Sequence, residues 1–185
     1  MILRLASLDD TVRLGRLLAE EVVNALAEQG PDASLALLLQ GELGSGKTTL
    51  AASFVKALPG GEEAEVSSPS FTLCNVYPTR PQVFHVDLYR AGPSPLPDEA
   101  AEALEGCAGS GGAVLAVEWP EYLLPEDRPA DALAIVFDPA CDPAFDKQDD
   151  ACDKARMLKL EAHGPCAARV LAGLGAALAP ASAPN

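Results

Sequence analysis

The stretch SLALLLQGELGSGKTTL, residues 34–50, determines the fold. Residues 34–40 form a short continuous apolar run, which is typical of a strand buried on both faces in a parallel sheet. Residues 41–48 read GELGSGKT and match the phosphate-loop pattern G-x-x-x-x-G-K-[ST]. Residues 50–58 are then apolar at helical period and end at Pro59. Because strand, glycine-rich turn and helix follow in this order, the sequence predicts a P-loop rather than an ordinary glycine turn.

This loop carries the groups that hold a nucleotide phosphate. Its glycines let successive N–H groups point at phosphate oxygens, and the helix N-terminus adds partial positive charge. Lys47 is expected to reach the β- and γ-phosphates, and the Thr48 hydroxyl to bind Mg²⁺. Thr49 is either a further phosphate contact or a plain helix residue. The predicted nucleotide-binding residues of the loop are Gly44, Ser45, Gly46, Lys47, Thr48 and Thr49.

Two acids at predicted strand ends are candidates for the rest of the site. Magnesium needs hard oxygen ligands beyond one hydroxyl, so an acid is expected at the end of another strand of the same sheet. Glu118 directly follows the apolar strand 113–117 and is the best placed; the alternative is an ordinary exposed acid. Asp87 is the second candidate, and period-two alternation places it on the same face as His85. We interpret His85 as a packed, hydrogen-bonded histidine rather than one that orients water or metal.

The remaining segments predict an α/β fold of the P-loop NTPase type, with a mixed, mostly parallel sheet flanked by helices. Two β-rich runs, 70–77 and 82–88, are joined by residues 78–81 and predict one antiparallel hairpin. Ser7 and Asp10 resemble a capping box at the start of a helix. The other predicted elements are a strand at 2–5, a helix ending at Gly30, a helix at 97–107, strands at 113–117, 132–137 and 156–161, and a helix at 165–178.

Composition limits the class of protein. The chain has 185 residues, 49% of them apolar, which predicts a single soluble domain over residues 1–178. Its 13 Lys and Arg against 27 Asp and Glu give a net charge of −14, which argues against direct, tight binding of nucleic acid. The five cysteines form no CxxC pair and follow no signal peptide, so a reduced, cytoplasmic location is expected. No apolar run approaches the roughly 18 residues that span a bilayer.

Two segments are predicted to lie outside the packed core. Residues 138–154 are rich in Asp and are interpreted as a solvated acidic loop. An EF-hand is excluded there, because no glycine is placed for the sharp turn and no Glu closes the loop. Residues 179–185, at the end of the chain, are predicted to be a disordered tail.

Four motifs together resemble the TsaE family, also called YjeE, the small ATPases of bacterial threonylcarbamoyladenosine tRNA modification. They are GELGSGKTTL (41–50), SSPSFTLCNVY (67–77), FHVDLYR (84–90) and VLAVEWPEYLLPEDR (114–128). The resemblance implies a cytoplasmic ATPase that uses ATP and Mg²⁺ and hydrolyses ATP only weakly without its partner proteins. It also implies two partner proteins, TsaB and TsaD, which handle the tRNA and transfer the threonylcarbamoyl group.

The resemblance also assigns roles to individual residues. It implies Lys47, Asp87 and Glu118 as catalytic residues, with Asp87 near the γ-phosphate. Thr48 and Glu118 would be the Mg²⁺ ligands. The nucleotide would also contact Asp87 and Glu118.

In two places the chain departs from the family pattern. Ser68, Pro69 and Phe71 match the family's SPTFTL-like segment, but Ser70 stands where Thr is usual, which preserves a hydroxyl. The Asp-rich stretch 138–154 is longer than the family requires. It leaves open which basic residue contacts the nucleotide, with Lys154 and Arg156 as the candidates.

Two alternatives to an ATPase of this family remain. A small-molecule kinase would share the P-loop and sheet, but it needs an Arg-rich lid, and few basic residues lie between Pro93 and Pro165. The second alternative is a docking module, in which ATP binding changes the affinity for a partner and hydrolysis is incidental. It needs the same phosphate loop, so the sequence cannot distinguish it from an ATPase. A GTPase lacks support, because no NKxD string occurs.

The single tryptophan, Trp119, follows Glu118 and precedes Pro120. At the carboxyl end of a strand it is expected either to pack near the nucleotide or to form part of a partner-docking surface. The alternative is a core tryptophan that senses neither. Pro120 is expected to hold Trp119 extended.

Overall fold

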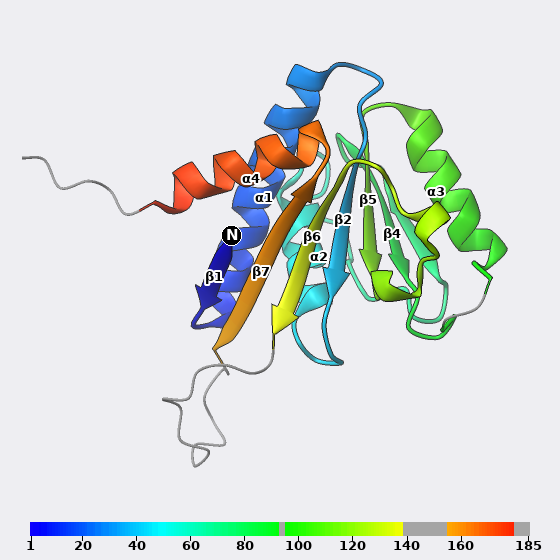
Figure 1. Ribbon diagram of the computed structural model, residues 1–185, viewed down its shortest axis with the longest axis horizontal. Coiled ribbons are helices and arrows are strands. Elements are labelled where there is room, and N and C mark those ends of the chain that lie inside the picture. The colour runs from blue at the N-terminus through cyan, green and yellow to red at the C-terminus, as the bar shows by residue number, and fades with distance from the viewer. Residues whose placement is uncertain (93–94, 139–154, 180–185) are drawn as a thin grey trace, which may run out of the picture.

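The computed structural model describes residues 1–92, 95–138 and 155–179. It shows a seven-stranded sheet with helices on both faces (Figure 1). The strand order across the sheet is β1-β7-β6-β2-β5-β4-β3. The strands are β1 (Ile2–Leu5), β2 (Leu35–Gln40), β3 (Cys74–Tyr77), β4 (Gln82–Asp87), β5 (Ala113–Glu118), β6 (Ala132–Asp138) and β7 (Arg156–His163).

Parallel strands form the centre of the sheet, and antiparallel strands lie at both edges. β6, β2, β5 and β4 are neighbours and run parallel, as the apolar runs predict. β3 and β4 form the predicted antiparallel hairpin. At the other edge β7 pairs antiparallel with both β6 and β1, a direction that the sequence did not predict. The α/β fold class is thus confirmed, with a second antiparallel edge added.

The helices bury two apolar clusters, one on each face of the sheet. α1, α2 and α4 cover the face that carries Leu37, Val83 and Leu133. α3 covers the opposite face over β4 and β5, where Val86 and Leu115 are buried (Figure 1). None of the described helices is long and apolar enough to cross a bilayer. The helices are α1 (Leu8–Gln29), α2 (Lys47–Ala57), α3 (Asp98–Ser110) and α4 (Pro165–Leu178).

The capping box at the start of α1 is confirmed. The Ser7 hydroxyl accepts a hydrogen bond from the Asp10 N–H at 3.2 Å, and Asp10 Oδ2 accepts one from the Ser7 N–H at 3.0 Å. Two N–H groups that the first helical turn leaves without partners are therefore satisfied. The helix ends at Gly30, as predicted.

Several predicted boundaries were wrong. α3 ends at Ser110 rather than at residue 107, and β7 ends at His163 rather than at residue 161. The first strand of the hairpin begins at Cys74 rather than residue 70, because Leu73 has a φ of 60° and interrupts the extended backbone. α2 begins at Lys47, directly at the end of the glycine loop, rather than at residue 50. Most of the acidic stretch 138–154 and of the tail lies outside the described residues, so those interpretations stay predictions.

Candidate functional site

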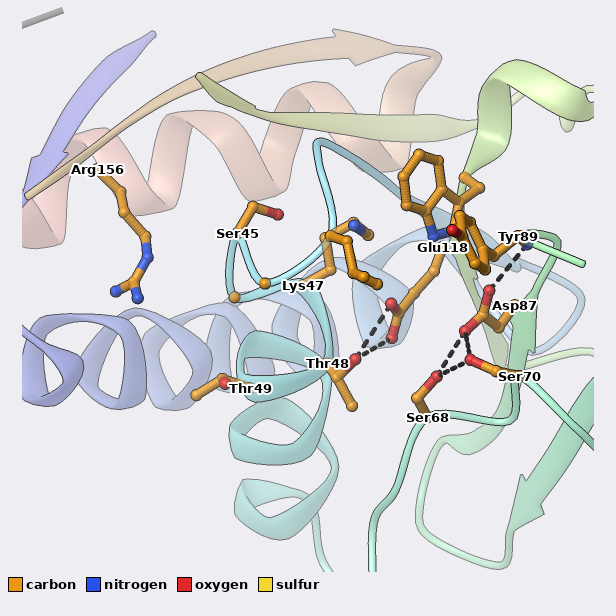
Figure 2. A pocket seen from close by; sticks show the side chains of 14 residues that line it. Ser45, Lys47, Thr48, Thr49, Ser68, Ser70, Asp87, Tyr89, Glu118 and Arg156 are labelled. Atoms are coloured by element: carbon orange, nitrogen blue, oxygen red, sulfur yellow. Dashed lines mark hydrogen bonds between the residues drawn. The ribbon is translucent and has the colours of Figure 1, made fainter. Parts of the chain in front are cut away.

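The predicted site residues meet at the carboxyl ends of the parallel strands. The glycine loop follows β2, while Asp87 and Glu118 end β4 and β5 and are paired in the sheet register. A cavity of about 360 Å³ opens there, lined by residues 44–49, Asp87 and Glu118 (Figure 2). Open α/β sheets bind ligands at this edge. The structure thus brings the whole predicted set together.

The backbone of the loop is arranged to receive an anion. Gly46 precedes α2 with a φ of 106°, a conformation that a side chain would strain. No side chain caps the start of α2, so the first N–H groups of the helix remain available to a phosphate. The buried Ser45 hydroxyl has no hydrogen-bond partner among the described residues. Buried polar atoms are normally paired, so this hydroxyl is an exception within the loop.

Lys47 lies folded against its own loop. Its ammonium donates to the carbonyls of Gly41 and Glu42, at 2.7 and 2.9 Å. The ring of Trp119 covers the same Nζ atom at 4.2 Å from the ring centroid. Burial lowers the pKa of Lys47, and the carboxylate of Glu118 partly opposes this. The lysine is therefore held at the floor of the cavity rather than extended into solvent.

Thr48 and Glu118 form the candidate metal pair. The Thr48 hydroxyl lies 2.8 Å from Oε1 and 3.1 Å from Oε2 of Glu118, and it donates to this carboxylate (Figure 2). Glu118 is 3% exposed, so its carboxylate is shielded from bulk water. Magnesium typically takes one or two protein oxygen ligands together with phosphates and water. A hydroxyl and a carboxylate in contact fit that donor set.

Asp87 holds a neighbouring segment in place. Its Oδ2 accepts hydrogen bonds from the hydroxyls of Ser68 and Ser70, both at 2.5 Å. Its Oδ1 accepts from the N–H of Tyr89 at 2.9 Å. Sequence reasoning placed Asp87 at the site but missed these two serines as its partners. The signal was present in the two hydroxyls spaced two residues apart in SSPS.

Trp119 lines the cavity, but its backbone differs from the prediction. It has φ 63° and ψ 49°, the left-handed region, rather than the extended conformation expected before proline. A following proline favours extended backbone, and the hydrogen bonds of this turn override that local preference. Two backbone hydrogen bonds hold Trp119 in this turn. Its N–H donates to Leu39 O at 3.2 Å, and the Tyr122 N–H donates to Trp119 O at 3.1 Å.

Aromatic and basic side chains complete the cavity. Trp119 packs against Tyr89 and Tyr122, with ring centroids 4.9 and 6.2 Å apart. Arg156, at the start of β7, also lines the cavity. The sequence left Lys154 and Arg156 as alternatives, and Lys154 lies outside the described residues. Of these two candidates, the structure describes only Arg156, and it places that side chain beside the loop.

Comparisons with known proteins agree with this geometry. A family model described as "Threonylcarbamoyl adenosine biosynthesis protein TsaE" matches residues 5–142. A protein of Aquifex aeolicus named tRNA threonylcarbamoyladenosine biosynthesis protein TsaE is 37% identical over 131 residues, covering 70% of this chain and 80% of that protein. One of the same name from Treponema pallidum is 36% identical over 137 residues, covering 71% and 90%.

A solved structure shows the same fold. The crystal structure of Bacillus subtilis YdiB superposes with a TM-score of 0.64, covering 96% of this chain and 95% of that one. The two sequences are 23% identical, so this likeness supports the fold alone.

Proposed function

Because the chain belongs to the TsaE family of threonylcarbamoyl adenosine biosynthesis proteins, we propose that it is the ATP-hydrolysing subunit of that system. It binds ATP and Mg²⁺ at the P-loop and works in the cytoplasm with TsaB and TsaD. The partners hold the tRNA, since this chain carries a net charge of −14.

One observation carries the proposal. The Thr48 hydroxyl, in the first turn of α2, contacts the buried Glu118 carboxylate at the end of β5, beside the uncapped helix start. A P-loop hydroxyl and a strand-end acid are the groups that hold the metal in P-loop NTPases. The left-handed backbone of Gly46 at this helix start is a second observation that favours an anion in the same cavity.

The residues divide the work of binding and hydrolysis. Lys47 would contact the β- and γ-phosphate oxygens from the floor of the cavity. Thr48 and Glu118 would hold the Mg²⁺, which neutralises charge on these phosphates when bound. Asp87 fixes residues 68 and 70 beside the cavity, which supports its proposed place near the γ-phosphate. Arg156 would add positive charge on the side of β7.

Hydrolysis is proposed to depend on the partners. Lys47 and Arg156 are the only basic side chains among the described residues that line the cavity. Phosphoryl transfer is fastest where further positive charge meets the transferred group, and many NTPases receive it from a partner in trans. Leu43, which lines the cavity, is 76% exposed, and Phe71, one residue beyond Ser70, is 83% exposed. Exposed apolar side chains close to a nucleotide site are suited to a protein partner.

The test compares ATP hydrolysis by this chain alone, with each partner, and with both. We expect low turnover alone and a marked rise with TsaB and TsaD together. Absence of hydrolysis in the complete mixture would contradict the proposal. The docking-module alternative is tested in parallel, by measuring complex formation and tRNA modification with ATP and with a non-hydrolysable analogue. A docking module would support tRNA modification equally well with the analogue.

A further inference from the structure

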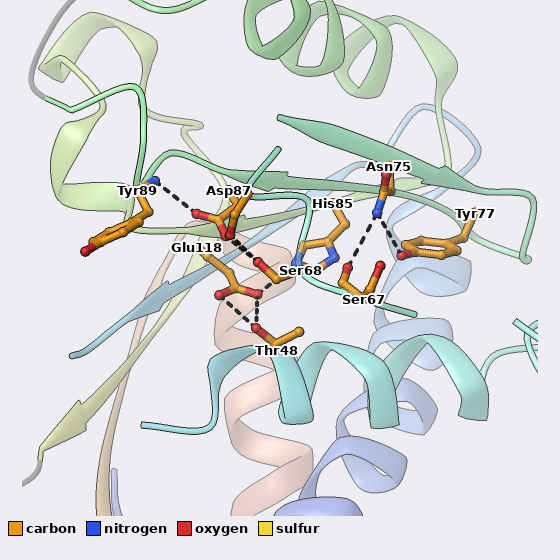
Figure 3. Close-up of polar contacts among 10 residues, drawn as sticks. Thr48, Ser67, Ser68, Asn75, Tyr77, His85, Asp87, Tyr89 and Glu118 are labelled. Atoms are coloured by element: carbon orange, nitrogen blue, oxygen red, sulfur yellow. Dashed lines mark hydrogen bonds and ion pairs between the residues drawn. The ribbon is translucent and has the colours of Figure 1, made fainter. Parts of the chain in front are cut away.

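His85 is a fully buried polar side chain directly behind the candidate metal ligand. It lies on β4, 0% exposed, and its Nε2 is 3.0 Å from Oε1 of Glu118 (Figure 3). Its side chain shares a sheet face with Val83 and Asp87, which β4 directs toward α2. The sequence predicted a packed, hydrogen-bonded histidine; the structure identifies Glu118 as its partner.

Within the described residues, the hydrogen bond to Glu118 is the one polar contact that explains a histidine here. An ionised carboxylate only accepts hydrogen bonds, so Nε2 carries the hydrogen and donates. The other ring nitrogen, Nδ1, is buried and has no hydrogen-bond partner among the described residues. A buried polar atom without a partner is unfavourable, and an apolar side chain of similar shape would avoid that loss. Packing alone therefore favours an apolar residue at this position.

The carboxylate of Glu118 is held from two directions. Thr48 approaches from the first turn of α2, and His85 approaches from within the sheet (Figure 3). Both donate to Oε1, while Oε2 accepts, from the part of the chain that the structure describes, only the longer contact from Thr48, at 3.1 Å. Two donors on one oxygen fix the plane of the carboxylate. They leave Oε2 with more of its accepting capacity free.

We propose that His85 is a positioning residue, which holds Glu118 in the orientation that binds the Mg²⁺ of the nucleotide. This inference rests on the proposed function. Residues that hydrogen-bond a metal ligand fix its orientation, and their loss typically weakens metal binding by about 10- to 100-fold. His85 acts through Glu118 and contacts neither the nucleotide nor the metal.

Two amide substitutions separate positioning from packing. The side chain of His85→Gln can place an amide nitrogen near the position of Nε2 and keep the donor to Glu118. The side chain of His85→Asn reaches only about as far as Nδ1 and loses that donor. Both variants are uncharged and polar, and they differ by one methylene. His85→Leu removes both nitrogens and serves as the apolar control.

The measurement is metal affinity rather than turnover. Mn²⁺ is titrated by electron paramagnetic resonance into the protein saturated with a non-hydrolysable ATP analogue. Calorimetry without metal reports the affinity for the analogue itself. We expect His85→Asn and His85→Leu to bind Mn²⁺ about 10- to 100-fold more weakly. His85→Gln is expected to stay within a few-fold of the unsubstituted protein, and affinity for the analogue without metal is expected to be unchanged.

Equal Mn²⁺ affinity in the Gln and Asn variants, or unchanged affinity in all three, would overturn the inference. Thermal unfolding is measured for each variant. If His85→Leu does not fold, the Gln and Asn pair still decides. A failure of the proposed function is recognised separately, because the unsubstituted protein would then bind neither the analogue nor Mn²⁺.

Discussion

The Thr48 hydroxyl donates to the carboxylate of Glu118, 70 residues later in the chain, at 2.8 Å from Oε1. This contact joins the first turn of α2 to the end of β5. It places a hydroxyl and a carboxylate side by side at the edge of the sheet where the glycine loop lies.

Replacing Lys47 with Ala is expected to abolish productive ATP binding and leave the fold intact. The lysine bonds its own loop rather than the core, so little apolar volume is lost. Hydrogen bonds to charged groups contribute about 1.5–3 kcal/mol each, which corresponds to at least about a 10-fold loss of affinity. Calorimetric titration with ATP and Mg²⁺ measures the affinity of the variant for the nucleotide. Unchanged affinity in the folded variant would refute the role of Lys47.

Glu118→Gln is expected to impair Mg²⁺-dependent hydrolysis more than nucleotide binding. The amide keeps the size of the side chain but loses the negative charge that holds the metal. We expect turnover to fall by about 100-fold, while affinity for ATP without metal stays within a few-fold. Wild-type turnover at saturating Mg²⁺ would show that Glu118 is only a strand-end acid. Glu121→Gln, close in sequence but exposed, serves as the matched control.

Asp87→Asn is expected to release the segment that carries Ser68 and Ser70. The variant loses the charge that both hydroxyls contact, and hydrogen bonds to charged groups contribute about 1.5–3 kcal/mol each. Hydrogen exchange measured by mass spectrometry is expected to show faster exchange in residues 67–73 and little change in α4. The double variant Ser68→Ala, Ser70→Ala should show the same pattern. Unaltered exchange in both variants would mean that these contacts do not hold the segment.

Fluorescence of Trp119 is expected to report binding. The chain has one tryptophan, and its ring lies over the Lys47 ammonium and lines the cavity. Adding ATP and Mg²⁺, and then TsaB and TsaD, should shift the emission in at least one step. Lys47→Ala should lose the shift caused by ATP. A spectrum unmoved by nucleotide and by partners would rule out both expected roles of Trp119.

Two cysteines are expected to resist alkylation in the folded protein. Burial raises the pKa of Cys107 and of Cys166 to about 11, with Asp131 also contributing at Cys166. At pH 8 only about one thiol in a thousand is then the reactive thiolate. Above about pH 9 these thiols lose their protons in the unfolded chain but keep them in the folded protein. The free energy of unfolding is therefore expected to fall as the pH rises from about 9 to about 11. Peptide mass analysis after iodoacetamide should find both unmodified until denaturant is added. Rapid labelling of the native protein would contradict their burial.

The sequence predicts the parts of this site that depend on local order along the chain. The glycine loop lies between an apolar strand and a helix, and Glu118 and Asp87 stand at the ends of strands that a parallel sheet aligns at one edge. These positions follow from motif and periodicity. The backbone of Trp119 was mispredicted, because the proline rule states a local preference for extended backbone, and the hydrogen bonds of Trp119 with Leu39 and Tyr122 override it.

Contacts between distant segments could not be predicted. The bond from His85 to Glu118 depends on the register of β4 against β5, and the bonds from Ser68 and Ser70 to Asp87 depend on how a loop returns to the sheet. The position of Arg156 beside the cavity depends on the antiparallel pairing of β7 with β6. Periodicity along one segment carries no information about pairing with another.

The most direct test of the central claim is the amount of threonylcarbamoyladenosine formed by purified TsaB and TsaD with this chain, supplied with tRNA and an activated donor of the threonylcarbamoyl group. Nucleosides from the digested tRNA are quantified by mass spectrometry, with ATP present and over many turnovers. The prediction is that the unsubstituted chain sustains product formation well beyond one equivalent per complex. The folded Lys47→Ala variant should yield no more than the mixture without this chain. Equal product with the variant and the unsubstituted chain would contradict an ATP-hydrolysing role for this site.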